Sequence, residues 1–173
     1  MSHYKKYPII FSFLISFYAL NCSAVEEVKY QDWAVQIGED TVEAYTLNDS
    51  KSSFGFFCKG ETCLYYLNLS LECPSNSKTP VLMSGDGVGS AFMMTCMKLG
   101  GRNFQILDDP EVVKRAVNSG KKIGFSVALQ GGDFMLAQFA LNGAQAAIER
   151  AILEAKQKRA QPKTGGAKGL ISI

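Results

Sequence analysis

Pairs of short apolar segments joined by tight turns constrain the fold of this chain more than any other feature of its sequence. Trp33, Val35 and Ile37 alternate with other residues, which is the period-2 pattern of a strand with one buried face. Residues 42–47 can pair with this strand across a turn at Gly38. Three further pairs follow, at residues 53–58 with 63–69, 80–84 with 91–97, and 122–129 with 134–141. The pattern predicts a mainly β fold, an antiparallel β sandwich or flattened barrel.

Two helices are predicted to flank this sheet. Asp109 is suited to cap the first helix, Pro110 fits its first position, and Gly120 ends it. The second begins near Asn142 and carries small apolar residues at helical spacing as far as Ala155. We expect the small-residue face of the second helix to pack on the sheet.

The first 24 residues have the features of a secretory signal peptide. Lys5 and Lys6 precede an uncharged run over residues 8–20, and small residues follow at a suitable cleavage point. That run is shorter than the roughly 20 apolar residues of a membrane helix. Cleavage would leave a single β-rich domain at residues 25–155, ending in a helix, and a basic, glycine-containing tail at 156–173. We therefore expect an exported protein, periplasmic or secreted, with lipid attachment at Cys22 as the alternative.

Four cysteines remain after the leader, and an even number in an exported domain is typical of two disulfides. They are Cys58, Cys63, Cys73 and Cys96. Three pairings are possible. The four residues between Cys58 and Cys63 can form a hairpin loop, which favours that bridge and leaves Cys73 with Cys96.

The charges argue against a nucleic-acid binder. Without Lys5 and Lys6, the 18 basic residues fall to 16, which equals the 16 acidic residues. The basic residues after Glu154 could make a weak contact with an anionic surface, although a solvated helix end is the plainer interpretation. These residues are Lys156, Lys158, Arg159, Lys163 and Lys168.

Residue types needed for common catalytic chemistry are scarce. His3, the only histidine, lies in the leader, so the exported chain would lack a histidine-activated nucleophile. The glycine-rich residues 84–90 lead into a strand, so they predict a turn between strands and no phosphate loop. We expect no enzyme activity, cofactor or metal. The alternative is a carbohydrate-active enzyme with two carboxylates about 5 to 10 Å apart, for which the available residues are Asp32, Glu43, Asp86 and Asp133.

Aromatic residues in the cysteine hairpin are the candidate binding face. Exposed tyrosine and phenylalanine carry much of the energy of protein interfaces, although strand alternation also suits a buried role. The candidates are Phe54, Phe56, Tyr65 and Tyr66.

The order of several motifs resembles the invasion-associated locus B family of exported bacterial proteins. The motifs are residues 32–35 (DWAV), the paired cysteines, GKK at 120–122 before an alternating strand, and FALNGA at 139–144. The resemblance implies an all-β periplasmic or surface domain, linked in some bacteria to host-cell entry, with no catalytic residues to carry over. We therefore expect a binding protein with a protein or envelope partner. An inhibitor or accessory subunit of an envelope complex is a further alternative, which predicts an exposed aromatic patch or a docked C-terminal strand.

Overall fold

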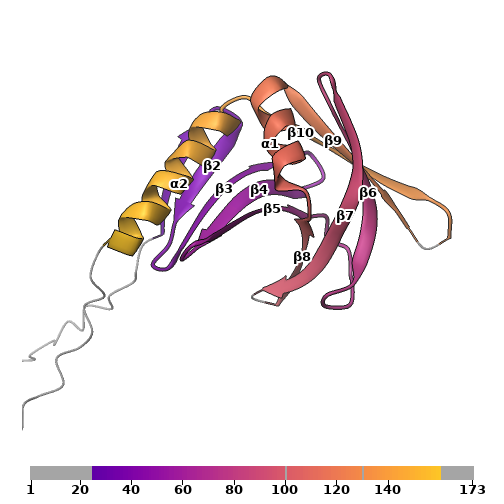
Figure 1. The fold of residues 1–173 in the computed structure, drawn as a ribbon, viewed down its shortest axis with the longest axis horizontal. Coiled ribbons are helices and arrows are strands. Elements are labelled where there is room, and N and C mark those ends of the chain that lie inside the picture. The colour runs from indigo at the N-terminus through magenta and orange to yellow at the C-terminus, as the bar shows by residue number, and fades with distance from the viewer. Residues whose placement is uncertain (1–24, 100, 130, 161–173) are drawn as a thin grey trace, which may run out of the picture.

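The fold is one ten-stranded antiparallel sheet that curls into a half-barrel (Figure 1). This computed structural model describes residues 25–99, 101–129 and 131–160, so the predicted leader at 1–24 and the tail after residue 160 lie outside the described residues. The strands are β1 (Glu26–Tyr30), β2 (Trp33–Ile37), β3 (Thr41–Leu47), β4 (Ser53–Lys59), β5 (Thr62–Asn68), β6 (Lys78–Gly85), β7 (Val88–Leu99), β8 (Arg102–Leu107), β9 (Lys122–Ala128) and β10 (Phe134–Ala140). The helices are α1 (Pro110–Ser119) and α2 (Ala144–Ala160).

The strand order is β1-β2-β3-β4-β5-β8-β7-β6-β9-β10. All four pairs predicted from the alternating segments are present, since β2 pairs with β3, β4 with β5, β6 with β7, and β9 with β10. The sheet is continuous because β8 joins β5 to β7 and β6 joins β7 to β9. Of the two predicted architectures, the flattened barrel is therefore the nearer to the observed half-barrel.

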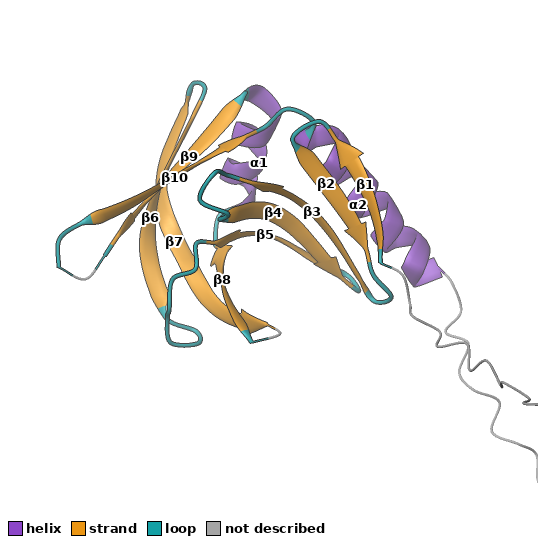
Figure 2. Cartoon of the chain, turned by 180° about the vertical axis from the view of Figure 1, so that it is seen from behind, coloured by secondary structure: helices purple, strands orange, loops and turns teal. Residues whose placement is uncertain are grey.

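Both helices cover the inner, concave face of the sheet. Asp109 caps α1 as predicted, because its side chain accepts a hydrogen bond from the Val112 N–H at 3.2 Å. The helix α1 contacts β5, β7 and β9, whereas α2 contacts β1 to β4 (Figure 2). The buried face of α2 consists mostly of alanine, so the helix can approach the strands closely. The sequence predicts that this helix ends near Ala155, whereas in the structure it continues to Ala160.

An aromatic cluster fills the space between the helices and the sheet. The Phe54 ring centroid lies 5.6 Å from Trp33, 5.4 Å from Phe125 and 5.8 Å from Phe139. These four side chains come from strands on both halves of the sheet and are almost fully buried. Their packing holds the curled sheet together because each buried aromatic side chain removes a large apolar area from water.

The turn between β1 and β2 meets the link between β10 and α2, and we call this contact the seam (residues 31–33 and 140–143). The Trp33 Nε1–H donates to the Ala140 carbonyl at 2.9 Å. The Asp32 backbone N–H donates to the Asn142 carbonyl at 3.3 Å, and Asn142 Nδ2 donates to Asp32 Oδ2 at 2.8 Å. The seam therefore brings the two ends of the sheet order together, although no strand pairing closes the barrel there.

Candidate binding sites

Both favoured disulfides are present. Cys58 and Cys63 face each other across the β4–β5 hairpin, with their Cα atoms 4.1 Å apart. Cys73 lies in the loop before β6 and is joined to Cys96 of β7, with a Cα–Cα distance of 6.1 Å. The second bridge fixes the 71–77 loop against the sheet, where the Asn76 N–H also donates to the Cys96 carbonyl at 2.8 Å.

The four aromatic residues proposed as a binding face do not form one. Phe54, Phe56 and Tyr65 lie on the inner face of the sheet and belong to the core. Tyr66 follows Tyr65 in the same strand and so points to the opposite, outer face. It is nevertheless only 3% exposed. The predicted binding face is therefore wrong for two reasons. All four side chains are buried, and Tyr65 and Tyr66 are adjacent in one strand and so cannot share a face.

Tyr66 is held in the outer face by close packing and a hydrogen bond. Its ring covers Gly55, where an added Cβ would lie 2.8 Å from the Tyr66 hydroxyl. The hydroxyl donates to the Glu43 carboxylate. Burial, and then the negative charge of Glu43, raise the pKa of Tyr66 well above 10. Burial also raises the pKa of Tyr65 to about 12. Both phenols are therefore neutral groups at physiological pH.

The four carboxylates considered for catalysis are separated and largely used in structural contacts. Asp32 belongs to the seam, and Glu43 accepts from Tyr66. Asp86 Oδ2 accepts from the Lys121 N–H at 2.8 Å and so ties the β6–β7 turn to the start of β9. Asp133 lies in the β9–β10 turn, where its carbonyl accepts from the Leu129 N–H at 2.8 Å. No three histidine, cysteine, aspartate or glutamate side chains in the described residues are grouped to hold a metal.

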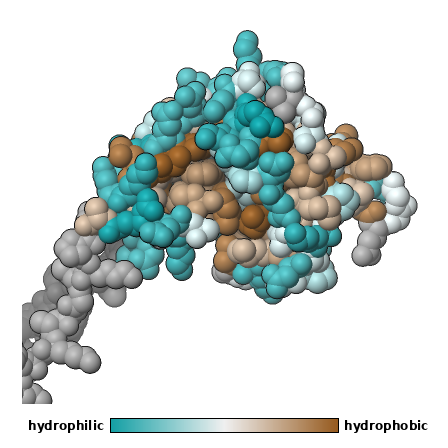
Figure 3. All heavy atoms as spheres, in the orientation of Figure 1, coloured by the Kyte–Doolittle hydropathy of each residue, from teal (hydrophilic) through white to brown (hydrophobic). Residues whose placement is uncertain are grey.

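A large apolar surface lies on the outer face of the sheet around β10. Leu136 is 75% exposed, Phe134 61% and Leu82 53%. Leu82 and Leu136 both pair with Ser126 of β9, from opposite sides, so the three residues form one row across the sheet. Figure 3 shows hydrophobic residues gathered on the side of the molecule that these strands occupy in Figure 1. We call this surface the β10 apolar face, and its members are Pro80, Leu82, Met93, Ala128, Phe134 and Leu136.

The free edge of β10 borders this apolar face. Ala140 directs its carbonyl away from β9 to Trp33, whereas the Leu141 N–H donates towards β9, to the Lys121 carbonyl at 2.8 Å. Backbone N–H and C=O groups of a strand residue point to the same side and alternate along the strand. The outward groups are therefore those of Phe134, Leu136 and Gln138. On this outward side, these N–H and C=O groups have no partner strand among the described residues, because β10 ends the sheet order.

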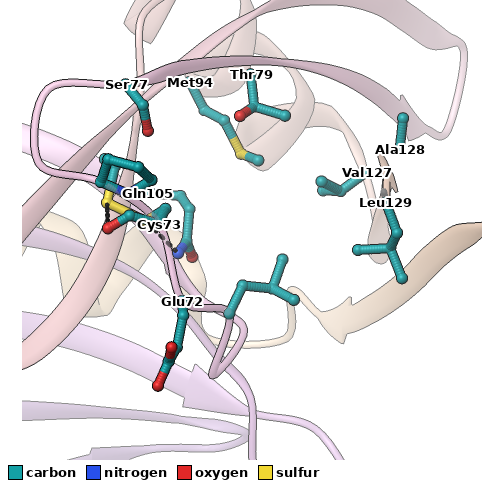
Figure 4. A pocket seen from close by; sticks show the side chains of 12 residues that line it. Glu72, Cys73, Ser77, Thr79, Met94, Gln105, Val127, Ala128 and Leu129 are labelled. Atoms are coloured by element: carbon teal, nitrogen blue, oxygen red, sulfur yellow. Dashed lines mark hydrogen bonds between the residues drawn. A yellow bond between two sulfur atoms is a disulfide. The ribbon is translucent and has the colours of Figure 1, made fainter. Parts of the chain in front are cut away.

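A hollow of about 380 Å³ opens on the inner side of the half-barrel, beside the Cys73–Cys96 bridge (Figure 4). We call it the mouth pocket. Figure 4 places Cys73 and Gln105 on one wall and Val127, Ala128 and Leu129 on the opposite wall, with Met94, Ser77 and Thr79 between them. Glu72 lies at the rim. The residue pattern does not predict this pocket, because it does not predict the strand β8, which carries the polar residue Gln105.

A second hollow, of about 390 Å³, lies on the outer face over β4, β5 and β8. Phe57, Leu64 and Phe104 supply its apolar surface. Lys59 and Arg102 also line it, and Glu43 is the single carboxylate in its lining. The lining thus combines apolar and charged side chains.

A hydrogen bond ties the described part of the basic tail to the domain. Lys158 Nζ donates to the Glu39 carbonyl at 3.2 Å. Lys156 and Arg159 lie in the same last turns of α2, whereas Lys163 and Lys168 lie outside the described residues. Within the described residues, no helix combines the length and the apolar character needed to cross a membrane.

Comparison with known proteins supports the fold. No protein-family model matches the chain, and no curated protein matches it. The fold is similar to that in the crystal structure of invasion associated protein B from Bartonella henselae. The TM-score is 0.54 at 17% sequence identity, and the match covers 76% of this chain and 99% of that chain. At the level of the fold, this likeness agrees with the resemblance suggested by the sequence.

Proposed function

We propose that this protein is an exported, disulfide-bonded binding protein of the bacterial envelope or surface, which captures a segment of a protein partner along the edge of β10. The observation that carries the proposal is the free, uncharged edge of β10 beside the β10 apolar face. A partner strand added there would bond to the outward N–H and C=O groups of Phe134, Leu136 and Gln138. Its apolar side chains would cover Leu82 and Leu136.

The two edges of the sheet differ in the way that this proposal requires. The β1 edge carries Glu26, Glu27 and Lys29, and charged side chains on an edge strand discourage further pairing. Lys29 Nζ lies 2.7 Å from Glu27 Oε1, and hydrogen bonds from Lys29, Gln36 and Tyr45 lower the pKa of Glu27 to about 2. In contrast, β10 contains neither a charged residue nor a proline. An edge left without these protections is suited to accept a strand.

The apolar residues of the face can supply the energy for such a contact. Fully burying one leucine or phenylalanine side chain contributes about 1.5–3 kcal/mol. The most exposed apolar residues of the face, Phe134 and Leu136, alternate along the strand and project on the same side. They would therefore meet alternate side chains of the added strand and set its register.

Three further observations support export and contact with a host cell. Two disulfides are typical of proteins outside the cytoplasm, and the sequence predicts a leader at residues 1–24. The likeness in fold to the invasion associated protein supports a link between this protein and host-cell entry. An accessory subunit of an envelope complex would use the same edge, and the identity of the partner distinguishes the two roles.

The carbohydrate-active alternative finds less support in the geometry. It needs two carboxylates at one cleft. Each of the four hollows considered in the described residues has one acidic side chain in its lining: Glu72 in two of them, Glu43 in the third and Asp32 in the fourth.

Photocross-linking in the exporting bacterium tests the proposal. Phe134 is replaced by p-benzoyl-phenylalanine, and Leu153, which is also an exposed apolar residue but lies on α2, provides the control position. We expect a discrete adduct from position 134 and none from position 153. The purified partner should then slow hydrogen exchange at the amides of Leu136 and Gln138, because these N–H groups become paired.

A charge on the edge provides the matched test of affinity. Leu136→Lys should weaken binding of that partner at least tenfold, whereas Leu153→Lys should leave the affinity unchanged. The proposal is wrong if position 134 gives no adduct, or if the partner binds the two lysine variants equally well.

A further inference from the structure

The mouth pocket has the size and lining of a site for a small molecule. Its volume of about 380 Å³ lies within the usual range of ligand pockets. Leu71, Met94 and Val127 make much of the surface apolar. Such pockets are frequent at the mouths of β-barrels.

The walls of the pocket are fixed in the absence of a ligand. The Cys73–Cys96 disulfide joins the 71–77 loop to β7. The Cys96 N–H also donates to the Ser77 carbonyl at 2.8 Å, so the backbone of the loop is paired with β7 next to the bridge. A preformed wall lowers the entropy that binding must overcome.

Gln105 provides a hydrogen-bond donor at the back of this pocket. It is 2% exposed, and its Oε1 accepts the Leu69 N–H at 3.3 Å. Its Nε2 group has two N–H donors, and the acceptor recorded for it among the described residues is the Cys73 sulfur at 3.7 Å. Sulfur is a weak acceptor, so a buried amide of this kind is poorly satisfied without a further partner.

The charges of the lining select the type of ligand. Glu72 is the only ionisable side chain among the lining residues, and no lysine or arginine is present there to pair with an anion. We propose that the mouth pocket binds a small neutral molecule with an apolar body and a carbonyl oxygen, which accepts a hydrogen bond from Gln105 Nε2. The pocket lies on the inner side of the sheet and shares only Ala128 with the β10 apolar face, and the partner strand and the small molecule would meet different groups, so this proposal stands independently of the proposed function.

Titration with 2-heptanone, followed by NMR of the oxidised mature protein, tests this site. The molecule has one carbonyl group on an apolar chain, and hexanoate provides a probe of similar length with a negative charge. We expect saturable shifts of the Gln105 side-chain amide and of the Met94 and Val127 methyl groups. Since a ligand this small reaches only modest affinity, a dissociation constant of about 1 mM is expected. Hexanoate should bind at least fivefold more weakly.

Two substitutions in the pocket and one control outside it connect the binding to the pocket. Thr79→Phe places a ring at the rim and should abolish the shifts, whereas Thr62→Phe, at an exposed position of the β4–β5 hairpin, should not. Gln105→Met should reduce the affinity for 2-heptanone at least fivefold. If that variant does not fold, the Thr79 and Thr62 variants still decide the question.

Three results would overturn the inference. The first is the absence of saturable shifts up to the solubility limit of 2-heptanone. The second is equal binding by the Thr79→Phe and Thr62→Phe variants. The third is equal or stronger binding of hexanoate, because the lining would then favour an anion.

Discussion

Replacing Gly143 by alanine should destabilise the protein more than any other single glycine-to-alanine change in a turn. Gly143 has a positive φ of 85°, and an added Cβ would lie 2.7 Å from the Tyr30 carbonyl carbon and closer still to its oxygen. A left-handed conformation costs an alanine about 1–2 kcal/mol. Forcing the seam apart adds about 1–3 kcal/mol, which is typical of overpacking. We therefore expect a loss of about 2–5 kcal/mol, a large share of the stability of a domain.

Gly132→Ala is the matched control for this prediction. Gly132 has a similar φ of 92°, but nothing lies within 4 Å of the position that its Cβ would occupy. Its substitution should therefore cost only the backbone contribution of about 1–2 kcal/mol. Urea denaturation followed by tryptophan fluorescence measures both losses, because Trp33 belongs to the seam. Equal losses for the two variants would refute the steric argument.

Two further predictions concern the disulfides and the buried phenols. The Cys73–Cys96 bridge spans a sequence separation of 23 and the Cys58–Cys63 bridge one of 5. Replacing both cysteines of a bridge by serine should therefore lower the free energy of unfolding, measured in urea, by about 3 kcal/mol for the first bridge and about 2 kcal/mol for the second. The reverse order would contradict the entropic estimate. The pKa of Tyr65 is raised from 10 to about 12, so the folded protein favours the neutral phenol. The contribution of this residue to the free energy of unfolding is therefore fully present below pH 10 and is lost as the pH rises through 12. The full loss from this residue is about 3 kcal/mol. Tyr65→Phe should reduce the decline in stability over that pH range, and an unchanged decline would show that other groups cause it.

The strand pairs could be predicted because each depends on residues close together in the sequence. The alternation in residues 53–69 and 122–141, and the glycines in their turns, indicate hairpins that the structure contains. The α1 boundaries follow from Asp109 and Gly120 for the same reason. Local chemistry therefore accounts for most of the elements.

The sheet order and two of its strands could not be predicted in this way. The strand β8 was missed because Gln105, one of its two buried residues, is polar and breaks the apolar alternation. Its pairing with β5 joins residues about 40 positions apart, as in Tyr66 with Ile106, and leaves no periodic signal. The strand β1 was also missed, since its charged residues resemble a loop.

The candidate sites depend on the same long-range arrangement. Leu82 and Leu136 are ordinary apolar strand residues in the sequence, and only the pairing of both strands with β9 makes them neighbours. The aromatic residues near the cysteines were the more visible signal, yet Phe54 and its neighbours form the core. Burial is a property of the assembled sheet, so the sequence could not assign these residues to a surface.

The seam has a consequence for the order in which the chain folds. Its hydrogen bonds join residues 107 and 110 positions apart. Contacts of such large sequence separation form slowly, because the loop they close is long. Both disulfide loops are complete by residue 96, well before Ala140. If the chain crosses a membrane from its N-terminus, the oxidation of its thiols can precede the closure of the half-barrel, which must wait for Asn142 to emerge.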